Sequence, residues 1–419
     1  MPRSVPSGAV GPESPLVART ELIDDPGDLV ALLPADGPLS WVHRGDGLVG
    51  WGEAARYDAS GASRFADAER WWREVAARSV IRDEAKLPGS GLVAFGSFAY
   101  ADLPGSSVLV VPEVVVGRRG STAWVTTIGR GSVFPPPVIQ PADPPELPEG
   151  PVFSDGVMSG ADWEIVVAGA VARIKAGELD KVVLARDLLV DLDAPLDVRA
   201  PLARLAARYP ACWTFSVEGF FGSTPELLLR RERGLVASRV LAGTIRRTGD
   251  DASDLALAAT LARSSKDLEE HEFAVRSVAD ALAPYCASMN LPDAPFVLHL
   301  PNVMHLATDV TGVLDDDASS LALAAALHPS AAVGGTPTAA AVALIGEIER
   351  LDRGRWAGPV GWIDADGDGE WGIGLRSAEY DGARVRLLAG CGIVADSDPA
   401  DELAESVAKL IPVRDALCG

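Results

Sequence analysis

The sequence predicts a large α+β sandwich, in which two mainly antiparallel sheets are flanked by helices. Several strand-like runs follow one another across short glycine turns, which favours antiparallel pairing. In the second half of the chain, helical stretches with apolar residues three and four positions apart alternate with such runs. The chain has 419 residues, 48% of them hydrophobic, which is enough for one large core or two ordinary ones.

The N-terminal third is expected to be mainly strands. Residues 1–20 are rich in Pro, Gly and Ser, and we expect them to be disordered. From 40 to 130, strand-like runs surround one amphipathic helix at 63–81. The segment 134–151, "FPPPVIQPADPPELPEGP", has too much proline for a helix or an inner strand. It predicts a connector between an N-terminal part, 21–150, and a C-terminal part.

The C-terminal part begins with a predicted helix over 159–180, which leads directly into the apolar run "KVVLARDLLV" at Lys181. Further predicted strands are "CWTFSVEGFFG", "ELLLRRERGLVASRVLAG", "GEWGIGLRSAEY" and "ARVRLLAGCGIV". Further predicted helices cover about 252–288, 318–327, 337–351 and 399–409.

Charge and cysteine content exclude several classes of function. The 59 acidic residues outnumber the 37 Lys and Arg, and the formal charge of −22 disfavours nucleic acid and anionic membranes as partners. No run reaches the ~18 apolar residues of a membrane span, and the N-terminus lacks an apolar signal region, so we expect a cytoplasmic protein. The cysteines are far apart and indicate neither structural zinc nor a disulfide framework: Cys212, Cys286, Cys391 and Cys418.

Two glycine-rich matches near the C-terminus do not indicate ligand sites. "GDGEWG", at 367–372, fits the dinucleotide-binding pattern, but a strand and not a helix follows it. "DADGDGE", from Asp364, resembles the start of a calcium loop, yet the twelfth position is Leu375 and not glutamate. We expect an Asp/Gly hairpin turn there.

Lys181 and Glu226 are candidates for proton transfer. Lys181 stands at the mouth of a buried strand, where an unpaired ammonium is costly; solvent exposure or pairing with Asp180 is the ordinary alternative. Glu226 follows Thr224-Pro225 and precedes an apolar run, so burial would raise its pKa, as a general acid requires. An uncharged lysine and a protonated carboxyl would then serve as base and acid.

Two predicted helices each carry a pair of acidic residues on one face. Asp267 and Glu270 are three apart in "SSKDLEEHEF", and Glu402 and Glu405 are three apart in "SDPADELAESVAKL". Carboxylate oxygens are the ligands that Mg²⁺ uses. In an acidic chain such pairs also arise as solvated faces.

The chain resembles the chorismate-utilising enzymes, and the isochorismate synthases among them most closely. The resemblance covers about 150–415 and rests on motifs in register: "KVVLAR", "GSTPELLL", "VLAGTIRR", "SSKDLEEHEF", "HPSAAVGGTP", "WGIGLRSAEY", "LLAGCGIV" and "DELAESVAKL". It implies the anthranilate synthase component I fold over 21–419 as a single unit, with 134–151 as a surface loop. It also implies the substrate chorismate, the cofactor Mg²⁺, no glutaminase subunit, and a monomer.

The resemblance also implies residue roles. Lys181 is the base that activates a water for attack on C2 of chorismate, and Glu226 is the acid that protonates the departing C4 hydroxyl. Ammonia-adding members typically have Gln in place of Lys181. The implied metal ligands are Glu270 and Glu405, supported by Asp267 and Glu402. Trp356 stands where relatives usually carry Tyr or Phe. The implied substrate-binding residues are Gly243, Thr244, His305, Ala332, Val333, Trp356, Arg376, Gly390, Gly392 and Lys409.

Three alternatives remain open. A salicylate synthase forms isochorismate and then eliminates pyruvate, and Ala332 and Val333 in "HPSAAVGG" resemble instead the enzymes that stop at isochorismate. An ammonia-using synthase conflicts with Lys181. A non-catalytic descendant that binds a carboxylate is expected to have lost Lys181, Glu226 or a metal carboxylate. Isochorismate feeds both menaquinone and siderophore synthesis, and the sequence does not choose between them.

Overall fold

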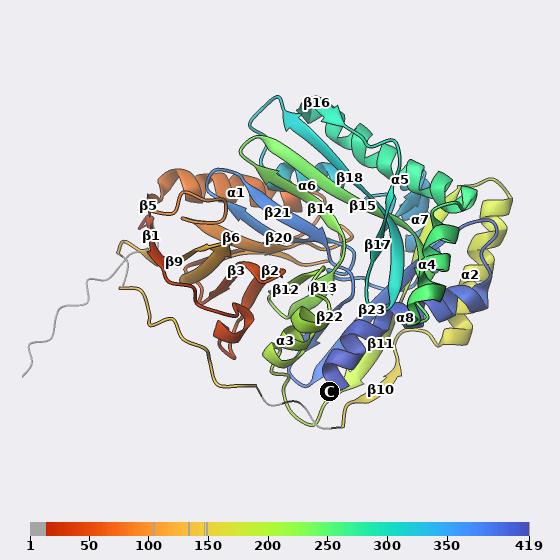
Figure 1. Cartoon of the computed structure of the whole chain (residues 1–419), viewed down its shortest axis with the longest axis horizontal. Coiled ribbons are helices and arrows are strands. Elements are labelled where there is room, and N and C mark those ends of the chain that lie inside the picture. Colours follow the sequence, from red (N-terminus) through yellow and green to blue (C-terminus); the bar gives the residue numbers. More distant parts are fainter. Residues whose placement is uncertain (1–13, 104, 133–134, 146, 148–149, 419) are drawn as a thin grey trace, which may run out of the picture.

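Two large antiparallel sheets form the framework of the protein (Figure 1). The computed structural model describes residues 14–418 except 104, 133–134, 146 and 148–149, and it leaves out the side chains of Lys266 and Glu270. Within these residues one sheet has 13 strands and the other has 10. The sequence-based prediction of an α+β sandwich with two mainly antiparallel sheets is confirmed.

The 13-stranded sheet joins strands from both ends of the chain, and it contains one parallel pair, β1 with β5. Its order is β10 (Val152–Asp155), β11 (Lys181–Asp191), β23 (Arg384–Ile393), β22 (Ser377–Asp381), β13 (Phe220–Thr224), β12 (Trp213–Val217), β2 (Leu39–His43), β3 (Asp46–Trp51), β8 (Val114–Arg119), β9 (Thr122–Arg130), β1 (Leu16–Ile23) and β5 (Val80–Asp83), with β19 (Gly335–Thr336) beside β11.

The 10-stranded sheet packs its apolar face against the first sheet. Its order is β16 (Cys286–Asn290), β18 (Val303–Leu314), β15 (Leu235–Arg246), β14 (Leu227–Glu232), β21 (Gly369–Ile373), β20 (Pro359–Asp364), β6 (Val93–Ser97), β7 (Ser107–Val111) and β4 (Ala55–Ala59), with β17 (Phe296–His299) beside β18. Fully buried aromatic residues from both sheets, such as Phe95, Phe215 and Trp371, share one core because alternate residues of each strand face it.

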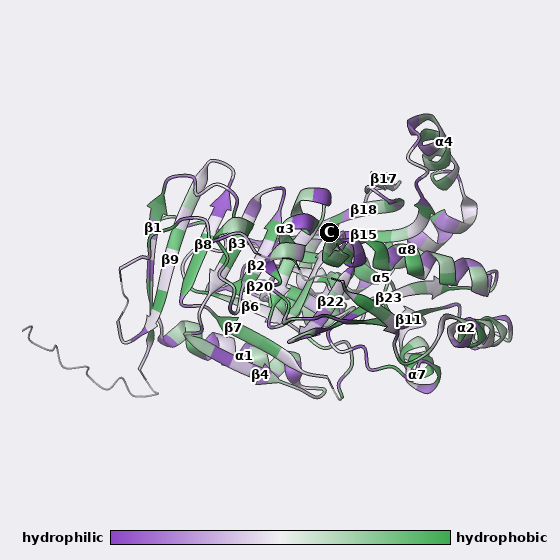
Figure 2. Cartoon of the chain, turned by 90° about the horizontal axis from the view of Figure 1, so that it is seen from below, coloured by the Kyte–Doolittle hydropathy of each residue, from purple (hydrophilic) through white to green (hydrophobic). Residues whose placement is uncertain are grey.

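Helices cover the outer faces of the sheets. Helices α5 and α6 pack on the 10-stranded sheet and α7 and α8 on the 13-stranded sheet. Figure 2 shows hydrophilic and hydrophobic stretches alternating along α1 and α2, as expected for helices with one buried face. The helices are α1 (Arg64–Arg78), α2 (Gly160–Lys175), α3 (Arg199–Arg208), α4 (Asp251–Leu261), α5 (Ser265–Leu282), α6 (Ser320–Leu327), α7 (Thr338–Ile348) and α8 (Pro399–Cys418), with 3-10 turns at Val30–Leu32 and Ala283–Tyr285.

Several predicted boundaries were wrong. Strand β1 begins at Leu16, so the expectation of disorder over 1–20 fails for 16–20, while 1–13 lie outside the described residues. The helix predicted at 252–288 is two helices, because the side chain of Ser264 accepts a hydrogen bond from Asp267 N and starts α5 anew. Helix α8 runs nine residues beyond the predicted end at 409. The strands from 286 to 314 were not predicted.

Two other predictions agree with the structure. The "DADGDGE" segment is the hairpin turn between β20 and β21, and the Asp364 carboxylate accepts hydrogen bonds from Asp366 N and Asp368 N, both at 3.0 Å. Helix α8 begins at Pro399, directly after Asp398. The segment 134–151 links β9 to β10, two strands of the same sheet.

Candidate active site

A cavity of about 240 Å³ is lined by residues of both sheets, from β11 and β23 of the 13-stranded sheet and β15 and β18 of the 10-stranded sheet, and by residues of helices α5 and α8. It brings together every site residue predicted from the sequence except Glu270, whose side chain lies outside the described residues. The predicted residues in its lining are Lys181, Glu226, Gly243, Thr244, Asp267, His305, Ala332, Val333, Trp356, Arg376, Gly390, Gly392, Glu402, Glu405 and Lys409. We refer to this cavity as the pocket.

Sequence reasoning missed some apolar residues of the lining. Val183 and Val394 lie two positions from Lys181 and Gly392, so the alternation of a strand could have identified them. No comparable local signal marks the others, which are Pro225, Leu241, Ala242 and Leu375.

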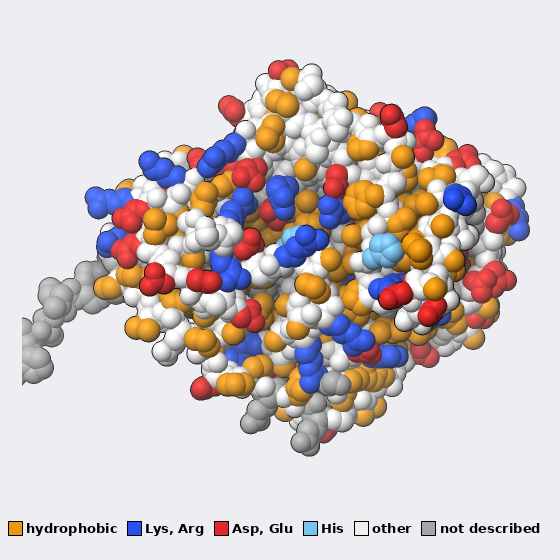
Figure 3. All heavy atoms as spheres, viewed as in Figure 1, with side chains coloured by type: hydrophobic (Ala, Val, Ile, Leu, Met, Phe, Trp, Pro, Cys, Tyr) orange, Lys and Arg blue, Asp and Glu red, His pale blue; other side chains and the backbone are white. Residues whose placement is uncertain are grey.

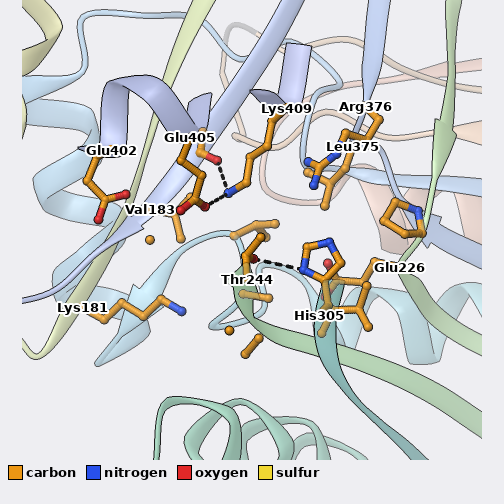
Figure 4. Close-up of a pocket in the computed structure, with 18 of the residues that line it drawn as sticks. Lys181, Val183, Glu226, Thr244, His305, Leu375, Arg376, Glu402, Glu405 and Lys409 are labelled. Atoms are coloured by element: carbon orange, nitrogen blue, oxygen red, sulfur yellow. Dashed lines mark hydrogen bonds and ion pairs between the residues drawn. The ribbon is translucent and has the colours of Figure 1, made fainter. Parts of the chain in front are cut away.

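Strand β11 presents Lys181 to the pocket. Lys181 is the first residue of β11 and pairs with Thr336 of β19 on one edge, while β23 runs along the other edge. Figure 4 shows the lysine side chain pointing into the pocket from the side on which Glu402 and Glu405 also lie. An ammonium placed at the entrance of this strand therefore faces the cavity.

Glu226 occupies the link where the chain crosses from the 13-stranded sheet to the 10-stranded sheet, between β13 and β14. Thr224 shapes this link, because its hydroxyl donates to Ile373 O at 2.6 Å and accepts from Glu226 N at 3.3 Å. Glu226 is only 6% exposed. Burial raises the pKa of Glu226 to about 7, although the charges of Arg376 and Lys181 act to lower it. The carboxyl is thus substantially protonated at neutral pH, as expected.

Arg376 is a half-buried cation that lines the pocket. Its φ of 50° is unusual for a residue with a side chain, and a residue held in this way is a candidate for function. Among the residues that the structure describes, none forms a hydrogen bond or ion pair with its guanidinium. Burial lowers the pKa of Arg376, but an arginine stays charged. The pocket therefore offers a bidentate donor for a carboxylate.

Helix α8 supplies a group of acidic side chains. One ligand atom each from Glu402, Glu405 and Cys391 lies within 4.8 Å of the other two. Burial would raise the pKa of Glu405, but the ammonium of Lys409, 2.6 Å away, holds it below its usual range. Burial raises the pKa of the Cys391 thiol, which stays protonated. The two carboxylates, with Asp267 across the pocket, fit a hard cation such as Mg²⁺ better than a soft one.

His305 and Thr244 form a polar pair on the neighbouring strands β18 and β15. Thr244 Oγ1 lies 3.0 Å from His305 Nδ1. Burial lowers the pKa of His305 to about 3, so the imidazole is neutral. The pair can therefore donate or accept a hydrogen bond without adding charge.

Glycines bring the backbone close to the pocket. Gly243 has a φ of 77° at a β-bulge of β15, and a Cβ there would meet the Asp267 side chain at 3.2 Å. A Cβ on Gly390 would lie 2.7 Å from Leu184 O and 2.8 Å from the ring of Trp356. Only glycine fits at Gly390 without displacing Trp356, whose ring forms this wall.

The chain was compared with known families. Residues 140–418 match the sequence model of the chorismate binding enzyme family. Two relatives are the isochorismate synthase MenF of Bacillus subtilis, 38% identical over 262 residues (62% of this chain and 56% of the relative), and the salicylate biosynthesis isochorismate synthase of Pseudomonas aeruginosa, 33% identical over 405 residues (90% and 84%). The match to the Bacillus protein thus spans little more than half of its length.

A solved structure agrees over nearly the whole chain. The menaquinone-specific isochorismate synthase MenF from Escherichia coli superposes with a TM-score of 0.80 at 25% identity, covering 98% of this chain and 96% of that one. In the part of the chain that the structure describes, no helix is both long and apolar enough to cross a membrane.

Proposed function

Since the chain belongs to the chorismate-binding enzymes, we propose that it is an isomerase that interconverts chorismate and isochorismate, adding water at C2 and releasing the C4 hydroxyl. One observation carries the proposal. Lys181 and the protonated Glu226 enter one pocket from different walls, beside a half-buried arginine, Arg376, that has no hydrogen-bond or ion-pair partner among the described residues. A base, an acid and an anion site are the three elements that this reaction requires.

The proton transfers balance without an external reagent. Lys181 takes a proton from the attacking water as its oxygen bonds to C2. Both ring double bonds shift, from C1=C2 and C5=C6 to C1=C6 and C4=C5, and the C4–O bond breaks as Glu226 gives its proton to the leaving hydroxyl, which departs as water. The reverse reaction uses the same residues in exchanged roles, so an equilibrium mixture is the expected end point.

The two carboxylates of chorismate need separate binding sites. We assign the enolpyruvyl carboxylate to Arg376 and the ring carboxylate to the side of the pocket with Glu402 and Glu405. Glu405 and Glu270, the ligands predicted from the sequence, with Glu402 and Asp267 in support, would hold Mg²⁺, which would supply positive charge for the ring carboxylate. On the face seen in Figure 3, basic side chains lie among acidic ones, so a net charge of −22 does not prevent local binding of an anion.

The proposed reaction also bears on the partners and the location of the protein. Because water is the nucleophile, no glutaminase partner is needed. We further propose that the enzyme acts as a monomer in the cytoplasm, and that its product enters menaquinone or siderophore synthesis; one relative is named as menaquinone-specific and another for salicylate biosynthesis.

The decisive experiment incubates the purified protein with chorismate and Mg²⁺, without ammonia or glutamine, and separates the products by chromatography and mass. A mixture of chorismate and isochorismate supports the proposal. Salicylate with pyruvate would instead assign the protein to the salicylate synthases. Absence of turnover, with and without ammonia, would favour a protein that only binds a carboxylate.

A further inference from the structure

The middle of one edge of strand β11 is held mainly by side chains and not by a neighbouring strand. On that edge β19 pairs with Lys181 and Val182, and β10 pairs only from Leu188 onward. Between them Val183 N still donates to Gly334 O at 2.9 Å, but Val183 O and both polar backbone atoms of Ala185 are bound by side chains, including Trp163, whose Nε1 donates to Ala185 O at 3.0 Å. Strand β11 presents Lys181 and Val183 to the pocket. The contacts that hold this edge of β11 therefore also hold Lys181, the proposed base, in place.

Glu349 and Arg353, which we call the positioning pair, fill this gap. Glu349 and Arg353 are 1% and 3% exposed. Arg353 Nε and Nη2 donate to the two carboxylate oxygens of Glu349 at 2.7 and 2.6 Å. Toward β11, Arg353 Nη2 donates to Val183 O at 2.7 Å, and Glu349 Oε2 accepts from Ala185 N at 2.9 Å. The pair thus replaces a missing strand at the residues next to the pocket.

The same guanidinium reaches two other walls of the pocket. Arg353 Nη1 donates to Val333 O at 3.0 Å. Its Cζ also lies 5.2 Å from the ring centroid of Trp356 and 4.3 Å from that of Tyr100. One side chain therefore contacts the strand of the base, the segment of Ala332 and Val333, and the tryptophan wall, although neither it nor Glu349 lines the pocket.

We infer that the positioning pair sets the relative placement of these three walls, and so the geometry between Lys181 and the substrate. A buried ion pair contributes little net stability after desolvation, so stability alone does not account for it. The planar guanidinium of Arg353 donates hydrogen bonds at fixed angles to Glu349, Val183 O and Val333 O, and the single ammonium of a lysine cannot reproduce this geometry. The expected effect on kcat/KM rests on the proposed function. The expected effect on the backbone of β11 rests on the geometry alone.

The test compares Arg353→Lys and Glu349→Gln with Arg231→Lys. Arg231 forms an ion pair of similar burial with Asp368, with side chains 9% and 6% exposed, and neither residue lines the pocket. We expect Arg353→Lys to lower kcat/KM about 10- to 100-fold, while Arg231→Lys lowers Tm similarly without this loss. Hydrogen exchange should accelerate at 181–186 and 331–336 in Arg353→Lys and not in Arg231→Lys.

Each outcome decides the matter. If the wild type does not turn over chorismate, the proposed function fails, and the exchange pattern still tests the positioning. If Arg353→Lys matches Arg231→Lys in exchange and in kcat/KM, the inference is overturned. Glu349→Gln provides the same comparison when Arg353→Lys does not fold. Failure of both to fold, with Arg231→Lys folded, would mean that the pair serves folding and would also overturn it.

Discussion

The charge of Lys181 acts on the carboxyl of Glu226 across the pocket. Lys181 begins β11, whereas Glu226 lies at the crossing between the sheets. Burial raises the pKa of Glu226, and the charges of Arg376 and Lys181 limit this rise to a pKa of about 7. In the proposed reaction Lys181 gains a positive charge when it takes a proton from the attacking water, and a positive charge near Glu226 makes that carboxyl a stronger acid, so the two proton transfers are coupled.

Replacing Lys181 with glutamine should abolish water addition while the fold is retained. Loss of a general base costs about 10²- to 10⁴-fold in rate. The measurement is isochorismate formation together with a circular dichroism melt. Lys175→Gln, an exposed lysine in the last turn of α2, is the matched control and should keep full activity. An unchanged rate in Lys181→Gln would rule out its assignment as the base.

Activity should fall as the pH rises above about 7. Glu226 acts as an acid only when protonated, and its pKa is about 7 in the folded protein. Measured from pH 5.5 to 9 at constant Mg²⁺ concentration, kcat/KM should decrease above about pH 7. Glu226→Gln should be inactive over the whole range. A flat profile to pH 9 would contradict the assignment of Glu226 as the acid.

The same carboxyl should make stability depend on pH. Its pKa rises from 4.5 to about 7 on folding, so the folded state binds more protons than the unfolded state between these values. Stability should therefore decrease from pH 4.5 to 7, by roughly 3 kcal/mol at about 1.4 kcal/mol per pKa unit. Urea denaturation of wild type and Glu226→Gln should differ in this slope, with the variant the flatter of the two.

Removal of the divalent cation should abolish activity, and Mg²⁺ should restore it. Glu402→Gln and Glu405→Gln should each weaken Mg²⁺ binding by more than about tenfold, since even indirect partners of a metal contribute 10- to 100-fold. Calorimetric titration with Mg²⁺ measures this without turnover. Asp401→Asn, an exposed acid on the same helix, is the control. A double variant that stays fully active in chelator would refute the metal site.

A methyl group at Gly390 should close the pocket. In Gly390→Ala the new Cβ would meet Leu184 O and the ring of Trp356 at 2.7 and 2.8 Å, which we expect to destabilise the protein by about 1–3 kcal/mol and to raise KM. Gly169→Ala is the matched control, because Gly169 lies inside α2 with nothing within 4 Å of its Cβ position. That change should stabilise the protein by about 0.5–1 kcal/mol. Equal effects at both sites would contradict the packing described.

Patterns between near neighbours in the chain predicted most of the framework. Period-two and helical spacing identified the strands around 181–191 and 384–393 and the helices α1, α2, α6 and α7, because alternation and amphipathicity depend only on nearby residues. The same reasoning failed at 252–288, where the side chain of Ser264 restarts the helix, and at β16–β18, where β16 and β17 pair with β18 and β18 also pairs with the distant strand β15.

The sequence by itself determined which chemical groups are present in this protein, including a lysine at the start of an apolar run, a glutamate after Thr-Pro, and two acidic pairs at helical spacing. Only the tertiary structure decided their environment. The raised pKa of Glu226 and the lowered pKa of Arg376 arise mainly from desolvation. Arg353 is bonded to Val183, 170 positions away. Desolvation and hydrogen-bond geometry depend on such distant neighbours, and no local pattern encodes them.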